Sequence, residues 1–365
     1  MRTRTAPAAL AAVLSVVAVT LAAEPKPPSA TAPVSATPAT TRVSYRPATR
    51  PIDAVDRVLI ISIDGLRPDL LTRADVPNLR ALMRGGSFTM WARTTAVSRT
   101  LPSHVSMLTG VPPHRHEIEW NRDLPLKKAV FPKGRTLFDI AKQYGYTTAL
   151  AAGKTKFDTF ERPGSVDWSW IVPPTTKPVA TKPAKEEGDD LEKDEWPDDK
   201  AKVGRTSVTD AEVAGRAVRM IREHRPQVML VHLPYVDFIG HTIGWGTPEQ
   251  IRAVGQADTA VGHLLYALDE VGVRGSTVVI VTADHGGAGH THGPDDPRSR
   301  HIPWIASGPG VRTDLDLTRF PGLEVNTEDT FATACYLLGM RPSANVTGKA
   351  IAEIVAREEL LGAAR

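Results

Sequence analysis

The chain is almost free of cysteine. Only one of its 365 residues is a cysteine, Cys335, so no intrachain disulfide can form. Cys335 lies in the apolar helical pattern FATACYLLG, which indicates a buried hydrophobic residue rather than a catalytic thiol. An excess of one charge is also lacking, because 44 Lys and Arg balance 41 Asp and Glu to within +3. This balance gives no reason to expect nucleic acid or an anionic membrane as a partner.

Long apolar runs are absent after the first 23 residues. Arg2 and Arg4 precede the Ala-rich run Ala6–Ala23, which ends in small residues and is followed by Glu24 rather than by a lipid-accepting cysteine. We expect residues 1–23 to be a signal peptide cleaved near Ala22 or Ala23; the alternative is an uncleaved N-terminal anchor. Either way we expect export, to the periplasm or as a secreted protein, with no membrane span in the mature form.

The remaining chain divides by composition. Residues 24–50 are rich in Pro, Ala, Thr and Ser and are predicted to be a linker, and residues 51–365 are predicted to be one catalytic domain. A Pro-rich and then densely charged stretch interrupts this domain at about residues 173–205. A solvated surface insertion is the preferred interpretation, and a substrate-selecting lid is the alternative.

Apolar strands alternate with helical patterns from residue 57 onwards. VLIISID (58–64) is a continuous apolar run, typical of a strand buried on both faces, and QVMLVHL and TVVIVTAD each follow a predicted helix. This alternation predicts the α/β class, with a mainly parallel sheet covered by helices on both faces.

Acidic residues follow three of these strands. Asp64 ends VLIISID, Asp237 follows VMLVHLPYV, and Asp284 with His285 ends VVIVTAD. Because ligands bind outside the carboxyl ends of parallel strands, we expect these side chains to converge at one edge of the sheet. A single Asp before Gly is as readily a turn residue, but three such residues together favour a site.

Histidines extend this set. His241 lies four residues after Asp237, a spacing that presents both side chains to one ion from a helical turn. In GHTHG the choice lies between His290 and His292, and we prefer His292. Carboxylates mixed with imidazoles suit divalent metals, and zinc suits them best, with manganese or iron as alternatives.

A nucleophile is predicted at Thr100. Pro102 is expected to begin the helix SHVSMLTG, which places Thr100 at the helix N-terminus, where backbone N–H groups favour a phosphate. Metal coordination would make its hydroxyl a nucleophile without a neighbouring base. Asn121, in IEWNRD, can donate to a non-bridging phosphate oxygen, although a turn residue is an equal alternative.

Several motifs follow one another along the chain: IISIDGLRPDLL, T-x-P-S-H-x-x-x-L-T-G, P-x-x-x-H-E-I-x-W-N, D-x-x-x-H, ADHGG and a later HG. Together they resemble the motifs of the alkaline phosphatase superfamily. The nucleotide pyrophosphatase/phosphodiesterase-like branch is the most similar. This resemblance implies an α/β/α sandwich with two Zn²⁺ ions and a phosphorylated Thr100. It assigns one ion to Asp64, Thr100, Asp284 and His285, and the other to Asp237, His241 and His292. Asn121 would be the oxyanion-stabilising residue.

The resemblance also ranks the alternative functions. Sulfatases of the superfamily carry Cys or Ser at the position of Thr100 and Arg at the position of His104. Leu101 stands where nucleotide-cleaving members often carry an aromatic residue. We therefore predict a phosphodiesterase acting on a small phosphate ester. The alternatives are a phosphomonoesterase or a sulfate or phosphonate hydrolase, then an envelope phospho-headgroup transferase or a non-catalytic binding protein. The oligomeric state stays open.

Overall fold

The computed structural model describes residues 49–122, 130–173, 208–294 and 296–356. All of them belong to one compact unit. The predicted signal peptide, nearly all of the predicted linker and nearly all of the charged insertion lie outside these residues. Within the described ranges, no helix combines the length and apolarity that a bilayer span requires.

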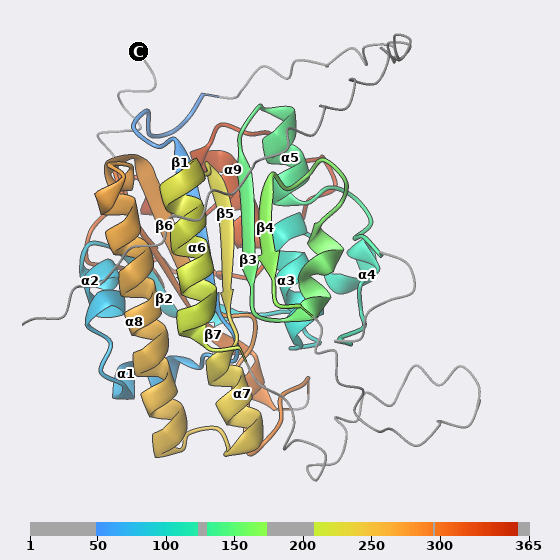
Figure 1. Ribbon diagram of the computed structural model, residues 1–365, viewed down its shortest axis with the longest axis vertical. Coiled ribbons are helices and arrows are strands. Elements are labelled where there is room, and N and C mark those ends of the chain that lie inside the picture. The colour runs from blue at the N-terminus through green and yellow to red at the C-terminus, as the bar shows by residue number, and fades with distance from the viewer. Residues whose placement is uncertain (1–48, 123–129, 174–207, 295, 357–365) are drawn as a thin grey trace, which may run out of the picture. The chain divides into compact units, whose positions relative to one another are not determined.

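An eight-stranded sheet forms the centre of the described structure (Figure 1), in the order β4-β3-β5-β1-β6-β7-β2-β8. Neighbours β3, β5, β1 and β6 run parallel, so that Ile60 pairs with Leu230 on one side and Ile280 on the other. The strands are β1 (Arg57–Ile63), β2 (Gly86–Arg93), β3 (Thr148–Ala152), β4 (Trp168–Ile171), β5 (Val228–Leu233), β6 (Thr277–Thr282), β7 (His301–Ser307) and β8 (Leu315–Asp316).

The mainly parallel sheet confirms the predicted fold class. One exception is β7, which is antiparallel to both β6 and β2. A strand buried on both faces has the same apolar sequence in either direction, so its pattern alone does not reveal this reversal.

Helices cover both faces of the sheet. Figure 1 shows α6 and α8 across the near face and α3 and α9 behind it. The α-helices are α1 (Pro68–Arg73), α2 (Pro77–Arg84), α3 (Thr100–Thr109), α4 (Pro113–His116), α5 (Leu137–Gln143), α6 (Asp210–His224), α7 (Tyr235–Thr242), α8 (Pro248–Glu270) and α9 (Asp329–Leu337). Short 3₁₀ turns are η1 (Thr155–Phe160), η3 (Arg274–Ser276), η4 (Pro297–Ser299), η5 (Leu317–Arg319) and η6 (Ala352–Ile354).

Side-chain hydrogen bonds hold the first turns of two of these helices, α5 and α2. The Thr136 and Asp139 side chains form a reciprocal capping box at the start of α5. Asp258, buried in the middle of α8, accepts hydrogen bonds from the Asn78 and Leu79 backbone N–H groups in the first turn of α2. This contact fixes α2 against α8 through groups that α2 leaves unpaired by its own geometry.

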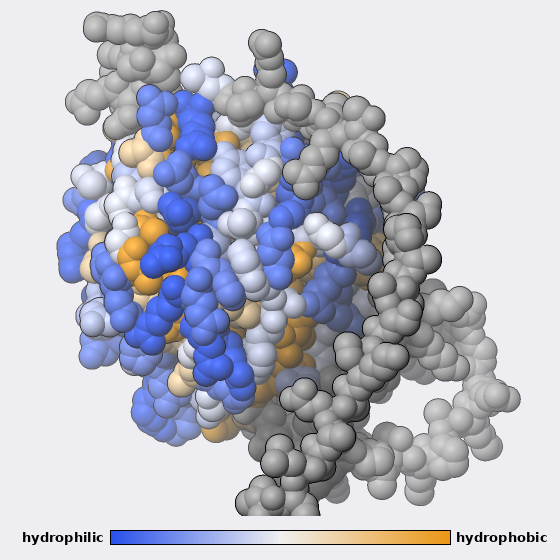
Figure 2. Space-filling model, turned by 45° about the horizontal axis from the view of Figure 1, so that its top comes forward, coloured by the Kyte–Doolittle hydropathy of each residue, from blue (hydrophilic) through white to orange (hydrophobic). Residues whose placement is uncertain are grey.

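Apolar side chains fill the space between the sheet and its helices. Every residue of β3, β5 and β6 is buried. The surface in Figure 2 is largely hydrophilic and is broken by small apolar patches. The sheet is therefore a rigid scaffold, and its strand ends are where polar side chains can meet.

Candidate metal centre and active site

Polar side chains meet where four neighbouring parallel strands end. Asp64 directly follows β1, Lys154 follows β3, Asp237 lies in the first turn of α7 after β5, and Asp284 and His285 follow β6. These strands are adjacent in the sheet, which is why residues far apart in sequence come together. All but Lys154 are buried.

Asp237 lies between two groups of candidate metal ligands. One group is Asp237, His241 and His292, and the other is Asp64, Asp237 and His285. The Asp237 Oδ1 atom is 3.3 Å from His241 Nε2, 3.9 Å from His292 Nε2 and 4.0 Å from His285 Nε2. Asp64 Oδ1 is 3.4 Å from His285 Nε2. By distance Asp237 belongs to both groups, whereas the family resemblance assigned it to one.

Asp284 supports the second group. Its Oδ2 atom lies 3.3 Å from His285 Nε2. Its Oδ1 atom accepts hydrogen bonds from the backbone N–H groups of Gly65 and His285, at 3.1 and 2.9 Å. These bonds hold the carboxylate in place with Oδ2 directed at the site.

The three candidate histidines are oriented alike. In each, Nδ1 lies 2.8 Å from a backbone carbonyl oxygen: Gly286 for His285, His290 for His241, and Ser98 for His292. A carbonyl only accepts hydrogen bonds, so each Nδ1 carries the proton and each Nε2 presents its lone pair to the site. The exposed His290 stays outside both groups and contributes its carbonyl to His241.

Burial favours the neutral, ligand form of His285 and His292. It lowers the pKa of His285, and it lowers that of His292 well below the usual range. Buried Oδ atoms of Asp64, Asp237 and Asp284 lack a hydrogen-bond partner in the described structure. Such carboxylate oxygens beside imidazole lone pairs are incomplete without a cation, so the residues present fit divalent metal ions.

The carboxylates themselves differ in their pKa values. Burial and the Asp64 charge raise the pKa of Asp284 well above its ordinary value. Burial also acts to raise the pKa values of Asp64 and Asp237. It is outweighed by the combined attraction of Lys154 and His232 at Asp64, and of Lys154 and His241 at Asp237, so both pKa values are held low. Two of the three acids therefore keep their charge beside a cation.

Thr100 begins α3 at the edge of this centre. The helix starts at Thr100 itself, two residues before the expected start at Pro102, and Arg99 is its N-cap. The hydroxyl oxygen of Thr100 lies 3.3 Å from His285 Nε2 and accepts a hydrogen bond from Lys154 Nζ at 3.2 Å. The side chain therefore combines burial, a helix N-terminus and proximity to the candidate ligands.

Asn121 contacts the residue that follows Thr100. Its Oδ1 atom accepts hydrogen bonds from the Leu101 backbone N–H at 2.9 Å and from Lys156 Nζ at 3.0 Å. Both partners are donors, which assigns this atom as oxygen and the other as the amide nitrogen. Lys156 is only 3% exposed and so holds the amide in one orientation.

Sequence analysis missed four residues that contact the site: Lys154, Lys156, His232 and His104. His232 Nε2 donates to Asp64 Oδ2 at 2.7 Å, because its Nδ1 accepts from the Gly153 backbone N–H. His104 lies beneath Thr100, with Nδ1 2.7 Å from its carbonyl oxygen. A signal was present in GKTKF, where two lysines directly follow a buried strand.

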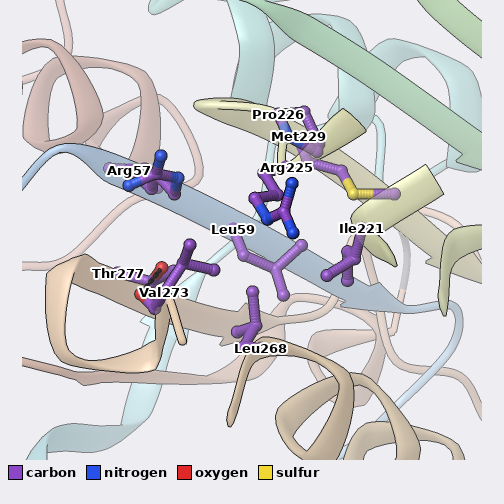
Figure 3. Close-up of a pocket in the computed structure, with 10 residues that line it drawn as sticks. Arg57, Leu59, Ile221, Arg225, Pro226, Met229, Leu268, Val273 and Thr277 are labelled. Atoms are coloured by element: carbon purple, nitrogen blue, oxygen red, sulfur yellow. Dashed lines mark hydrogen bonds between the residues drawn. The ribbon is translucent and has the colours of Figure 1, made fainter. Parts of the chain in front are cut away.

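Two hollows are lined by other residues. One, drawn in Figure 3, is an apolar pocket between Leu59, Ile221, Met229 and Leu268 with free volume of about 10 Å³, enough for one water at most. It lies at the amino ends of β1, β5 and β6, the opposite edge of the sheet from the candidate site. The other, about 470 Å³, is lined by residues that include Arg67, Trp91 and His301.

Comparison with known families gives one match over most of the chain. Residues 58–295 match the family described as type I phosphodiesterase/nucleotide pyrophosphatase. An uncharacterized pyrophosphatase/phosphodiesterase of Schizosaccharomyces pombe is 24% identical over 63% of this chain and 44% of its own length. Mouse bis(5'-adenosyl)-triphosphatase is 23% identical over 63% of this chain and 47% of its own length. The chain spans less than half the length of these relatives.

Solved structures share the fold. Murine ectonucleotide pyrophosphatase/phosphodiesterase 5, an inactive variant in complex with AMP, superposes with a TM-score of 0.62. It is 13% identical, and the match covers 82% of this chain and all of that one. A phosphonate monoester hydrolase of Agrobacterium radiobacter has a TM-score of 0.57 and 18% identity over 82% of this chain and 77% of its own.

Proposed function

The chain belongs to the type I phosphodiesterase/nucleotide pyrophosphatase family of phosphoric ester hydrolases, and we propose that it is an exported phosphodiesterase in which Thr100 is the nucleophile of a two-metal site. One observation carries the proposal. The Thr100 hydroxyl lies 3.3 Å from a ligand atom, His285 Nε2, of one of two ligand groups that share Asp237. A nucleophile at such a position reaches phosphorus held by the same groups.

The candidate ligands fit two divalent ions, with Asp64, Asp284 and His285 on one side and His241 and His292 on the other. Asp237 is within reach of both positions. When bound, such ions lower the pKa of a coordinated hydroxyl and stabilise charge on the attacking and leaving oxygens. Zinc suits this Asp/His set best, with manganese or iron as alternatives.

The chain's own groups then act in two displacements. Thr100 loses its proton to solvent, its oxygen attacks phosphorus, and the bond to the leaving oxygen breaks with its electron pair. The Asn121 amide donates to the non-bridging oxygen on which charge builds. Water then attacks the phosphothreonine, the bond between phosphorus and the Thr100 oxygen breaks, Thr100 regains a proton, and a phosphate monoester leaves.

The natural ester is a separate question. A bis(5'-adenosyl)-triphosphatase among the relatives and AMP in a structural neighbour support testing nucleotides as substrates. A phosphomonoesterase on the same site is the second candidate, supported by Lys154 beside Thr100. A sulfate or phosphonate hydrolase ranks below it, and a headgroup transferase lower still.

Model esters test the substrate class. The zinc-loaded protein is expected to hydrolyse bis-p-nitrophenyl phosphate with a higher kcat/KM than p-nitrophenyl phosphate. A monoester preference would replace the phosphodiesterase proposal with a phosphatase. Absence of metal-dependent release from either ester would contradict the hydrolytic site and favour a binding protein.

Substitutions test the residue roles. Thr100→Ala is expected to abolish turnover and to keep both metal ions, because Asp and His side chains supply most of the ligands. Substantial activity in this variant at full metal content would refute Thr100 as the nucleophile. Asp237→Asn is expected to lower the metal content of the folded protein, measured by elemental analysis, and unchanged stoichiometry would remove Asp237 from the ligand set.

The location in the cell is also testable. Export follows from the predicted signal peptide, residues 1–23, and is measured by fractionating cells that express the full chain. An unprocessed protein in the cytoplasm would contradict it.

A further inference from the structure

Lys154 introduces a positive charge beside the candidate nucleophile. Its Nζ atom lies 2.6 Å from Asp64 Oδ2, 2.7 Å from Asp237 Oδ2 and 3.2 Å from the Thr100 hydroxyl oxygen. The side chain is 14% exposed. Lys154 lies two residues after the end of β3, and Lys156 lies two residues further along.

This placement makes Lys154 more than a surface charge. Asp64 and Asp237 are candidate metal ligands, so the Lys154 ammonium competes with metal ions for the same two carboxylates. Once Asp64 and Asp237 are engaged as ligands, their negative charge is shared, and the ammonium is attracted less to them. Of the Asp64, Asp237 and Thr100 oxygens near Lys154 Nζ, the Thr100 hydroxyl is the one at which a negatively charged phosphoryl group must arrive.

The charge of that phosphoryl group depends on the ester. A monoester carries about two negative charges above a second pKa of about 6, whereas a diester carries one. The extra charge of the monoester lies on a non-bridging oxygen, which is the atom that a lysine near Thr100 can contact by a charge-assisted hydrogen bond.

We propose that Lys154 is a specificity-determining residue that binds a non-bridging oxygen of the phosphoryl group. It contributes more to the hydrolysis of esters with a second negative charge on phosphorus than to that of diesters, so that its loss widens the expected diester preference. This inference rests on the proposed function, because it needs Thr100 at the reacting centre. Its alternative is a purely structural role, in which Lys154 neutralises buried carboxylates in the metal-free protein and has no effect on the choice of ester.

Two esters with the same leaving group separate these roles. p-Nitrophenyl phosphate and methyl p-nitrophenyl phosphate differ only by a methyl group on a non-bridging oxygen, which removes one negative charge. With Lys154→Gln, kcat/KM for the monoester is expected to fall about 10- to 100-fold more than for the methyl diester. Lys154→Arg is expected to restore most of the discrimination, because it keeps the charge.

Controls isolate the charge at this position. Lys142→Gln removes the same charge from the exposed surface, where Lys142 pairs with Asp167 at 2.6 Å, and is expected to leave both rates unchanged. Metal content and circular dichroism are measured for every variant. Equal losses for both esters in metal-loaded, folded Lys154→Gln would overturn the proposal, as would no loss for either.

A binding measurement separates this inference from the proposed function. Inorganic phosphate is titrated calorimetrically into metal-loaded Thr100→Ala protein with and without Lys154→Gln. The dissociation constant is expected to rise at least about tenfold when Lys154 is removed. If the wild type hydrolyses neither ester, the proposed function fails, and an unchanged phosphate affinity would then overturn the Lys154 contact as well.

Discussion

Asp210 is a buried carboxyl group whose ionisation should oppose folding. It begins α6, is 2% exposed, and accepts a hydrogen bond at Oδ1 from the Tyr235 backbone N–H at 3.0 Å. Its Oδ2 atom has no partner in the described structure. Burial raises the pKa of Asp210 to about 7, against the hydrogen bond from Tyr235, which lowers it.

The sign and size of the effect follow from this pKa. The folded protein keeps the Asp210 proton up to about pH 7, whereas the unfolded chain loses it near 3.8. The contribution to stability is therefore full below about pH 4 and is lost as pH rises towards 7. Linkage puts the loss between pH 5 and 8 at about 2–3 kcal/mol.

Asp210→Asn removes this titration and keeps an acceptor for Tyr235. The free energy of unfolding of the variant minus that of the wild type is expected to increase by about 2–3 kcal/mol from pH 5 to pH 8. Urea unfolding of metal-free protein, followed by circular dichroism, measures this difference. Asp53→Asn, at an exposed position, is the matched control for the same substitution outside the core. A pH-independent or falling difference for Asp210→Asn would refute the reasoning.

Three further predictions concern buried groups elsewhere. Burial lowers the pKa of His116 to about 4, so the protein loses stability as pH falls from about 6.5 towards 4. His116→Gln should lose about 1–3 kcal/mol less of its free energy of unfolding on acidification than the wild type. Equal losses in the two proteins would contradict this. Asp258→Ala leaves the Asn78 and Leu79 N–H groups without their acceptor and should lower the free energy of unfolding by about 2–4 kcal/mol in denaturant titrations, whereas a change near zero would show that these bonds contribute nothing. Burial raises the pKa of Cys335, so native protein should resist iodoacetamide until it unfolds; rapid alkylation, seen by mass spectrometry, would place the thiol at the surface.

The sequence predicted the part of the fold that depends on local pattern. Continuous apolar runs marked β1, β5 and β6 because both faces of those strands are buried, and each run ended within a few residues of its site residues. β2 was missed, because its burial is irregular along GSFTMWAR and it lacks such a run. The reversal of β7 was missed because strand direction is a property of the connections rather than of the strand.

The sequence likewise marked some residues of the candidate site and missed others. Asp64, Asp237, Asp284 and His285 were marked because each comes soon after a predicted strand, and strand order brings them to one edge. Lys154 and His232 were missed because a lysine normally indicates solvent and a histidine inside an apolar strand indicates core. Only the pairing of β3, β5 and β1 shows that both contact Asp64.

A covalent phosphothreonine is the feature on which the proposed mechanism depends. Metal-loaded protein is mixed with bis-p-nitrophenyl phosphate, quenched in acid within the first turnover, digested and analysed by mass spectrometry. The account predicts a p-nitrophenyl phosphoryl group on the peptide that contains Thr100, and its absence from Thr100→Ala. Full turnover with no modified Thr100 at any quench time, or a modification on another residue, would contradict it.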